Sequence, residues 1–169
     1  MPEAAVSSTP LAFACEPHMR FGPAAVWLTS PPGLVAQLVE PCRGTVELAN
    51  WLVGPVYEAL DRRAAGRNAL MFVFDLSLMN GRSNASRTVL LSKARQCSKR
   101  FAEAIVVAPY AATKVQLHSL YAGMSLARAL GVRVNLADSV HAAVDRLSLR
   151  PAAPPRPVHA LELAPSLAK

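Results

Sequence analysis

The sequence is poor in the features that mark membrane and secreted proteins. Although 52% of its 169 residues are apolar, no apolar run reaches the roughly 20 residues that a membrane-spanning helix needs. Residues 1–14 have neither a basic stretch nor a long apolar block, so no secretory signal is predicted. The three cysteines, Cys15, Cys42 and Cys97, are odd in number and widely spaced, which predicts no disulfide framework. We therefore expect a cytoplasmic protein that is not transmembrane.

Signatures of nucleotide and nucleic-acid binding are also scarce. Gly81 follows an apolar run, but it stands alone, without the GxGxxG or GxxxxGK[ST] pattern that cradles phosphates. Only 6% of the residues are aromatic, and none of them alternates with the basic residues between 83 and 100, so unpaired bases would find no stacking platform there. We predict no cofactor, and nucleic acid is an unfavoured partner.

Acidic and histidine residues are too scattered to predict a metal site or catalytic residues. Asp75 ends an apolar run, but no other carboxylate follows before Glu103. General acid–base catalysis and Mg²⁺ binding usually need more than one carboxylate. The four histidines show no zinc-ligand spacing. We expect Asp75 to accept hydrogen bonds from the turn that follows it, and Ser77 to be a second polar residue at this strand end.

Acids are scarcest where bases are most frequent. The net charge is +7, and residues 68–100 hold a single acid, Asp75, against six bases, which are Arg82, Arg87, Lys93, Arg95, Lys99 and Arg100. Such a run is most often the solvated face of a helix. The alternative is a patch that attracts an acidic partner, a phosphate or a lipid headgroup.

Strand and helix patterns alternate along most of the chain. The predicted strands cover residues 24–30, 34–40, 70–76, 104–108 and 132–136. The predicted helices cover 45–66, with a kink at Pro55, and 83–100, 113–130 and 140–147. We predict an α/β fold with a mixed, mostly parallel sheet of about five strands and about four helices, in the order β-β-α-β-α-β-α-β-α.

The two ends of the chain lack sustained periodicity. Prolines interrupt residues 1–22, which we predict to be a flexible N-terminal arm. Residues 150–169 contain five prolines and predict a disordered, Pro-rich tail with a brief helical turn at 159–163. One folded domain is therefore expected over residues 23–149.

Three segments carry a resemblance to a known family. The strand Phe72-Val-Phe-Asp75-Leu-Ser77, the serine-bearing start of the next helix, and the closing segment 137–147 together resemble the STAS superfamily of anti-sigma-factor-antagonist-like and lipid-binding-like domains. The resemblance covers about residues 24–148 and implies a bacterial-type regulatory domain that is not an enzyme. In relatives from sigma-factor pathways, a serine at this helix start is phosphorylated, which makes Ser83 and Ser86 the candidate phosphorylation sites. The Asp-Ser-Ser-Gly motif of the family is replaced here by Arg82-Ser-Asn-Ala-Ser86.

The turn at residues 78–87 carries the predicted contact residues. Serine and asparagine at a helix start ordinarily cap free backbone N–H groups. The same N–H groups and two flanking arginines would also hold a small anion. The candidates for partner or anion contact are Arg82, Ser83, Asn84, Ser86 and Arg87. We predict a regulatory or protein-interaction module that contacts a protein partner through this turn and the adjacent basic helix.

Two alternatives remain open at this point. A small-ligand or lipid-binding domain would need an apolar groove, for which the candidate lining residues are Trp27, Trp51, Phe72 and Tyr121. A less favoured alternative is an enzyme that uses Asp75 and a nearby serine, which would require a base within hydrogen-bond reach of that serine.

Overall fold

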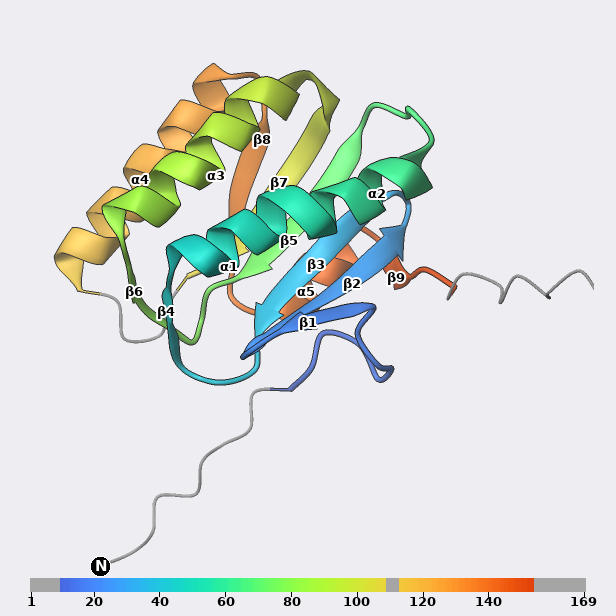
Figure 1. Ribbon diagram of the computed structural model, residues 1–169, viewed down its shortest axis with the longest axis horizontal. Helices are drawn as coiled ribbons and strands as arrows, with labels where there is room; N and C mark the ends of the chain where they lie inside the picture. The colour runs from blue at the N-terminus through green and yellow to red at the C-terminus, as the bar shows by residue number, and fades with distance from the viewer. Residues whose placement is uncertain (1–9, 109–112, 154–169) are drawn as a thin grey trace, which may run out of the picture.

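A mixed β-sheet forms the centre of the molecule (Figure 1). The computed structural model describes residues 10–108 and 113–153. The strands of this sheet run in the order β1-β2-β3-β5-β7-β8, and β9 pairs with β2. Their bounds are β1 (Met19–Phe21), β2 (Ala24–Ser30), β3 (Gly33–Leu38), β5 (Leu70–Asp75), β7 (Phe101–Val107), β8 (Arg133–Ala137) and β9 (Arg150–Pro151). The pairs β3–β5, β5–β7 and β7–β8 are parallel, whereas β2 is antiparallel to its neighbours.

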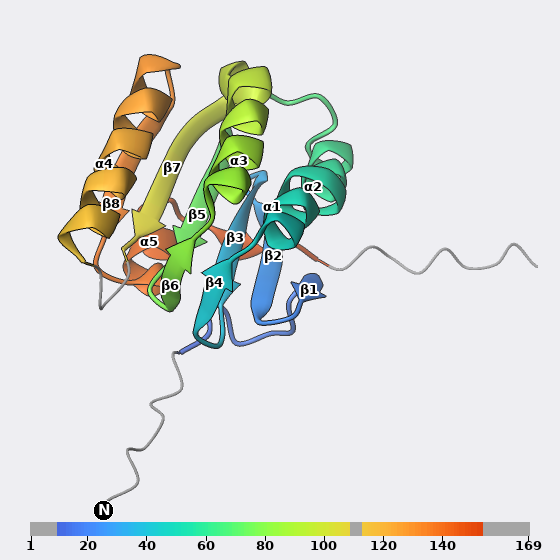
Figure 2. The ribbon, with the colours of Figure 1, turned by 60° about the vertical axis from the view of Figure 1, so that its left-hand side comes forward.

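Helices cover both faces of this sheet. One face carries α1 (Val46–Trp51), η1 (Leu52–Val56), α2 (Tyr57–Ala64), α3 (Asn84–Cys97) and α4 (Lys114–Ala129), and the other carries α5 (Val140–Arg146), as Figures 1 and 2 show. A short 3₁₀ turn, η2 (Ser98–Arg100), joins α3 to β7. The predicted α/β class and the mostly parallel sheet are confirmed. The sheet has seven strands rather than about five.

Strand β5 is the central strand that its apolar sequence predicts. It lies between β3 and β7, and both Leu70 and Val73 are fully buried. Val73 packs with Trp27, Ile105 and α5 on one face of the sheet. Leu70 packs against η1 and α2 on the other face. A strand enclosed on both faces needs apolar residues at successive positions, which is why it reads as a continuous run.

The helix after the short strand β4 (Cys42–Gly44) has the start, kink and end that its sequence predicts. Thr45 is the N-cap of α1, and its hydroxyl accepts a hydrogen bond from the N–H of Leu48. The kink expected at Pro55 takes the form of the π-helical segment η1, which widens the helix at the point where proline has no N–H to donate. The helix ends at Ala64, and Ala65 then adopts the left-handed conformation that reverses the chain.

The other helices also begin at the residues that the sequence indicates. Side-chain oxygens of Ser83, Thr113 and Ser139 cap α3, α4 and α5. Each accepts a hydrogen bond from an N–H in the first turn of its helix. These caps satisfy donors that a helix start would otherwise leave free.

The prediction of a loose arm is wrong for residues 10–21. Strand β1 pairs with β2, and Ala12 is buried in the core. The Trp27 indole N–H donates to the Cys15 carbonyl, and the Gln37 amide donates to the Pro10 carbonyl. These contacts join residues far apart in sequence, so local composition gives no sign of them.

The prediction of a disordered tail is wrong for residues 150–153. Strand β9 adds to the edge of β2, and the Ala152 N–H donates to the Leu28 carbonyl. Ala152 is only 5% exposed. Proline at position 151 is tolerated because this is an edge strand. Residues 1–9 and 154–169 lie outside the described residues, and so does the helical turn expected at 159–163.

The expected turn at 78–87 contains a strand. Strand β6 (Met79–Arg82) pairs in parallel with β4 (Cys42–Gly44) to make a separate two-stranded sheet. Neither segment alternates clearly between apolar and polar residues, and each is too short to be recognised from periodicity. This small sheet joins the start of α1 to the start of α3.

Candidate functional site

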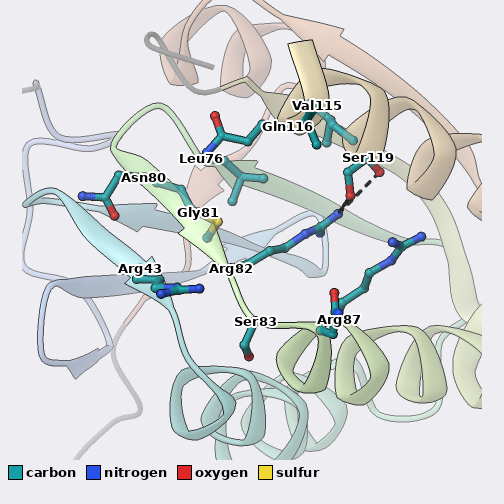
Figure 3. A pocket seen from close by; sticks show the side chains of 13 residues that line it. Arg43, Leu76, Asn80, Gly81, Arg82, Ser83, Arg87, Val115, Gln116 and Ser119 are labelled. Carbon is teal, nitrogen blue, oxygen red and sulfur yellow. Dashed lines mark hydrogen bonds between the residues drawn. The ribbon is translucent and has the colours of Figure 1, made fainter. Parts of the chain in front are cut away.

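A cleft of about 490 Å³ opens between β4, β6 and the first turns of α3 and α4 (Figure 3). It lies beyond the carboxyl ends of the parallel strands β5 and β7, the edge at which open α/β sheets usually bind ligands. Its lining is mixed: arginines and uncharged polar residues share it with apolar side chains. The lining residues are Arg43, Leu76, Met79, Asn80, Gly81, Arg82, Ser83, Asn84, Arg87, Val115, Gln116, Ser119 and Leu120.

Arg82 crosses this cleft. Its side chain extends from the end of β6 to α4, where Nη2 donates to the Ser119 hydroxyl at 3.1 Å and lies 3.4 Å from the Ser119 carbonyl oxygen (Figure 3). Burial lowers the pKa of the Arg82 guanidinium, and the neighbouring charge of Arg87 lowers it further. Arg82 is therefore a partly buried cation whose described partners are neutral.

The cleft brings three arginines together without a carboxylate. Arg43 comes from β4, Arg82 from β6 and Arg87 from the first turn of α3. None of them takes part in an ion pair with any described residue. No acid lines the cleft, and between Leu76 and Ala137 the sequence has only one, Glu103. Glu103 bonds instead to Asn135 and Arg146. An anion that enters the cleft would meet unopposed positive charge.

The serines of the helix start differ in accessibility. Ser83 is half-buried at the rim of the cleft and caps α3 by accepting from the Ser86 N–H at 3.0 Å. Asn84 is exposed beside it. Ser86 is only 2% exposed, and its hydroxyl lies within hydrogen-bond distance of the Gly44 and Ser83 carbonyls. The prediction that Ser86 contacts a partner or is phosphorylated is therefore wrong, because the hydroxyl is enclosed between β4 and α3.

Asp75 and Ser77 have a structural role at the end of β5. Asp75 is 2% exposed, and its Oδ1 accepts from the Ser77 N–H, as expected for a carboxylate at a strand end. Its Oδ2 accepts from the side-chain amide of Gln37, which also bonds to Pro10 and Ala12 of the N-terminal segment. The buried Ser77 hydroxyl has no hydrogen-bond partner among the described residues. The structure thus gives no support to an enzyme that uses Asp75 and this serine.

The predicted aromatic groove does not form. Trp27 is fully buried with α5 on one face of the sheet. Trp51 and Phe72 pack on the opposite face. Tyr121 lies on α4 with 52% of its surface exposed. The four side chains share no cavity, because strands of one sheet point their residues to two faces and the sequence does not say which face a helix will cover.

Metal-ion clusters and membrane-spanning helices are both absent from residues 10–108 and 113–153. No group of three or more histidine, cysteine, aspartate or glutamate side chains is placed to hold a metal ion there. No helix in this part of the chain combines the length and the apolar character needed to cross a membrane.

The sequence predicted the part of the cleft formed by residues 78–87 but not the part formed by β4 and α4. It identified Arg82, Ser83, Asn84 and Arg87 but not Arg43, Gln116 or Ser119. The available signal was topological. Loops that follow neighbouring parallel strands meet at one edge of the sheet, so the start of α4 after β7 had to lie near the start of α3 after β5.

Comparison with known proteins gives a match in structure but not in sequence. No protein-family model matches the chain, and no curated protein matches it. Among solved structures, the chain is similar to an uncharacterized protein of the DUF3478 family with a SpoIIAA-like fold, from Shewanella loihica PV-4. The TM-score is 0.52 at 13% sequence identity, and the match covers 73% of this chain and 91% of the other. The chain therefore has the SpoIIAA-like fold, which is the fold of STAS domains.

Proposed function

We propose that this protein is a non-enzymatic regulatory module of STAS type that binds a protein partner in the cytoplasm. The contact surface consists of β6, the first turn of α3 and the cleft beside them, and is called the β6–α3 surface below. The observation that carries the proposal is that Arg43, Arg82 and Arg87 all line one cleft whose lining contains no carboxylate. Surface charge of one sign accelerates and orients association with an oppositely charged partner.

The arrangement of the β6–α3 surface suits recognition. Arg82 is fixed by Ser119, and the N-terminus of α3 is fixed by the Ser83 cap and by the bond between Ser86 and Gly44. Side chains held in place lose less conformational entropy when a partner binds. Exposed Asn80 and Asn84 add hydrogen-bonding groups at the rim.

Ser83 is the candidate regulatory residue of this surface. It is half-buried at the rim of the cleft, and it belongs to the same lining as Arg82 and Arg87. A phosphate on Ser83 would add about two negative charges and neutralise part of the positive charge that the partner meets. Mass spectrometry of protein purified from its host tests this point: unmodified Ser83 under all growth conditions would contradict it.

Affinity capture from native lysate tests the partner-binding proposal. We expect one or more proteins to be retained by the wild-type chain and lost with Arg87→Glu. Arg62→Glu is the matched control, because Arg62 is an exposed arginine in the last turn of α2, outside the cleft. Ser83→Asp should weaken retention in the same direction as Arg87→Glu. Equal recovery of the same proteins by all four chains would contradict the proposal.

A further inference from the structure

We propose that the cleft binds an organic phosphate monoester, with its phosphate on Arg43, Arg82 and Arg87 and its organic part on the apolar wall. The inference deepens the proposed function and rests on it for the importance of the β6–α3 surface. It adds the chemical class of the group that this surface recognises.

The positive charge of the cleft favours the binding of an anion. Arg82 loses hydration on burial and is repelled by Arg87, and both effects lower its pKa. No ion pair with a described residue offsets this, since none of the three arginines is in one. An anion held between the guanidinium groups of Arg82 and Arg87 would relieve the repulsion and replace the lost hydration. A phosphate monoester, with close to two negative charges near neutral pH, matches three cations better than a carboxylate does.

The hydrogen-bonding capacity of the arginines fits phosphate. A guanidinium presents five N–H donors in a planar fork, which suits bidentate bonds to phosphate oxygens. The two contacts of Arg82 with Ser119 use only Nη2. Nε and Nη1 of Arg82 make no hydrogen bond with a described residue. Ser119 thus holds Arg82 in an extended position and leaves most of its donors for a ligand.

The volume of the cleft and its apolar lining residues indicate a ligand larger than inorganic phosphate. A volume of about 490 Å³ lies within the range of small-molecule sites. The apolar part of the lining, called the apolar wall here, consists of Leu76, Met79, Val115 and Leu120. Val115 is 79% exposed, so its methyl groups are accessible to a ligand in the cleft. An ester group packed against this wall would bury apolar surface that is now in contact with water.

Calorimetric titration with small probes tests the inference directly and needs no knowledge of the partner. The probes are phenyl phosphate, inorganic phosphate and phenol. We expect phenyl phosphate to bind more tightly than inorganic phosphate, because it also reaches the apolar wall. Phenol should not bind measurably, because it lacks the charge. Binding of phenyl phosphate should weaken as salt is added, since screening reduces the attraction of charges.

Single substitutions locate the bound group. Arg43→Gln and Arg87→Gln should each weaken phenyl phosphate binding about tenfold or more, the loss expected for one charge-assisted hydrogen bond. Arg62→Gln on α2 should bind as the wild type does. Thermal melting of each variant shows whether it is folded, and Arg87→Lys keeps the charge but loses the fork, so it should bind with intermediate affinity.

A phosphoserine peptide with neutral flanking residues distinguishes two sources of the phosphate. Tighter binding of the peptide than of phenyl phosphate would indicate a phosphorylated residue of a protein partner. The reverse order would indicate a free, small phosphate ester. If neither probe binds, or if both arginine variants bind phenyl phosphate as the wild type does, the inference is overturned. The proposed function would still stand if Arg87→Glu abolished capture of the partner.

Discussion

At the scale of single residues, one buried hydrogen-bond network explains the polar side chains that the sequence offers as catalytic candidates. Asp75 is enclosed at the end of β5, where it accepts from Gln37 and from the Ser77 N–H. Gln37 in turn accepts from the Ala12 N–H. Asp75 therefore links the central strand to the N-terminal segment, and its carboxylate is used for structure.

We expect Asp75→Ala to destabilise the fold by about 2–4 kcal/mol, because it leaves the buried Gln37 amide and the Ser77 N–H without an acceptor. Urea unfolding followed by circular dichroism measures the change. Ser77→Ala provides the comparison: its hydroxyl has no partner among the described residues, so this variant should be as stable as the wild type or more stable. Equal stability of the Asp75 variant and the wild type would contradict the network.

At the scale of elements, the start of α3 combines two roles. Ser83 caps the helix, and Ser86 ties it to β4. Ser86 is the one fully buried residue of α3, and the rest of the helix is half-buried or exposed. The Ser83 cap and the Ser86 contact with Gly44 both act on the first turn, which carries Arg87.

Substitutions at Ser83 separate capping from charge. Ser83→Ala should lower stability by about 1 kcal/mol, because the Ser86 N–H loses its acceptor. Ser83→Asp should retain wild-type stability, since aspartate is an equally good N-cap and its charge is favoured at a helix start. In a titration with phenyl phosphate, only the aspartate variant should bind markedly more weakly. A loss of binding with alanine equal to that with aspartate would show that the cap, and not the charge, governs the site.

At the scale of the whole molecule, both ends of the folded region close over the same antiparallel edge of the sheet. Strands β1 and β9 each pair with β2. Leu149 and Ala12 belong to one core cluster, although they lie near opposite ends of the chain. The folded unit thus extends beyond residues 23–149 in both directions.

Truncation tests the contribution of the C-terminal strand. A chain that ends at Ala153 should be more stable than one that ends at Ser148, by about 2–4 kcal/mol. The difference arises because Leu149 and Ala152 are 4% and 5% exposed and β9 covers part of the edge of β2. Comparison of the two melting temperatures measures this difference. Identical values would show that β9 adds nothing to the fold.

The α/β class, the order of the main elements and the helix caps could be predicted because they depend on near neighbours in sequence. The run from Leu70 to Asp75 is apolar at almost every position, which only a strand enclosed on both faces requires. Ser83, Thr113 and Ser139 stand immediately before helical periodicity. The resemblance to STAS domains is confirmed at the level of the fold.

The sequence by itself determined that a central strand near residues 70–76 is followed by a helix near residues 83–100. It also determined that residues 68–100 hold six bases and a single acid. Only the tertiary structure decided what those bases face. The cleft needs Arg43 beside Arg82 through the β4–β6 pair, and it needs Ser119 across from both. The packing of α3 against β4 also encloses Ser86, whereas Ser83 lies at the rim of the cleft. Contacts between distant segments depend on how the sheet and helices pack as a whole, and no local pattern of residues encodes that arrangement.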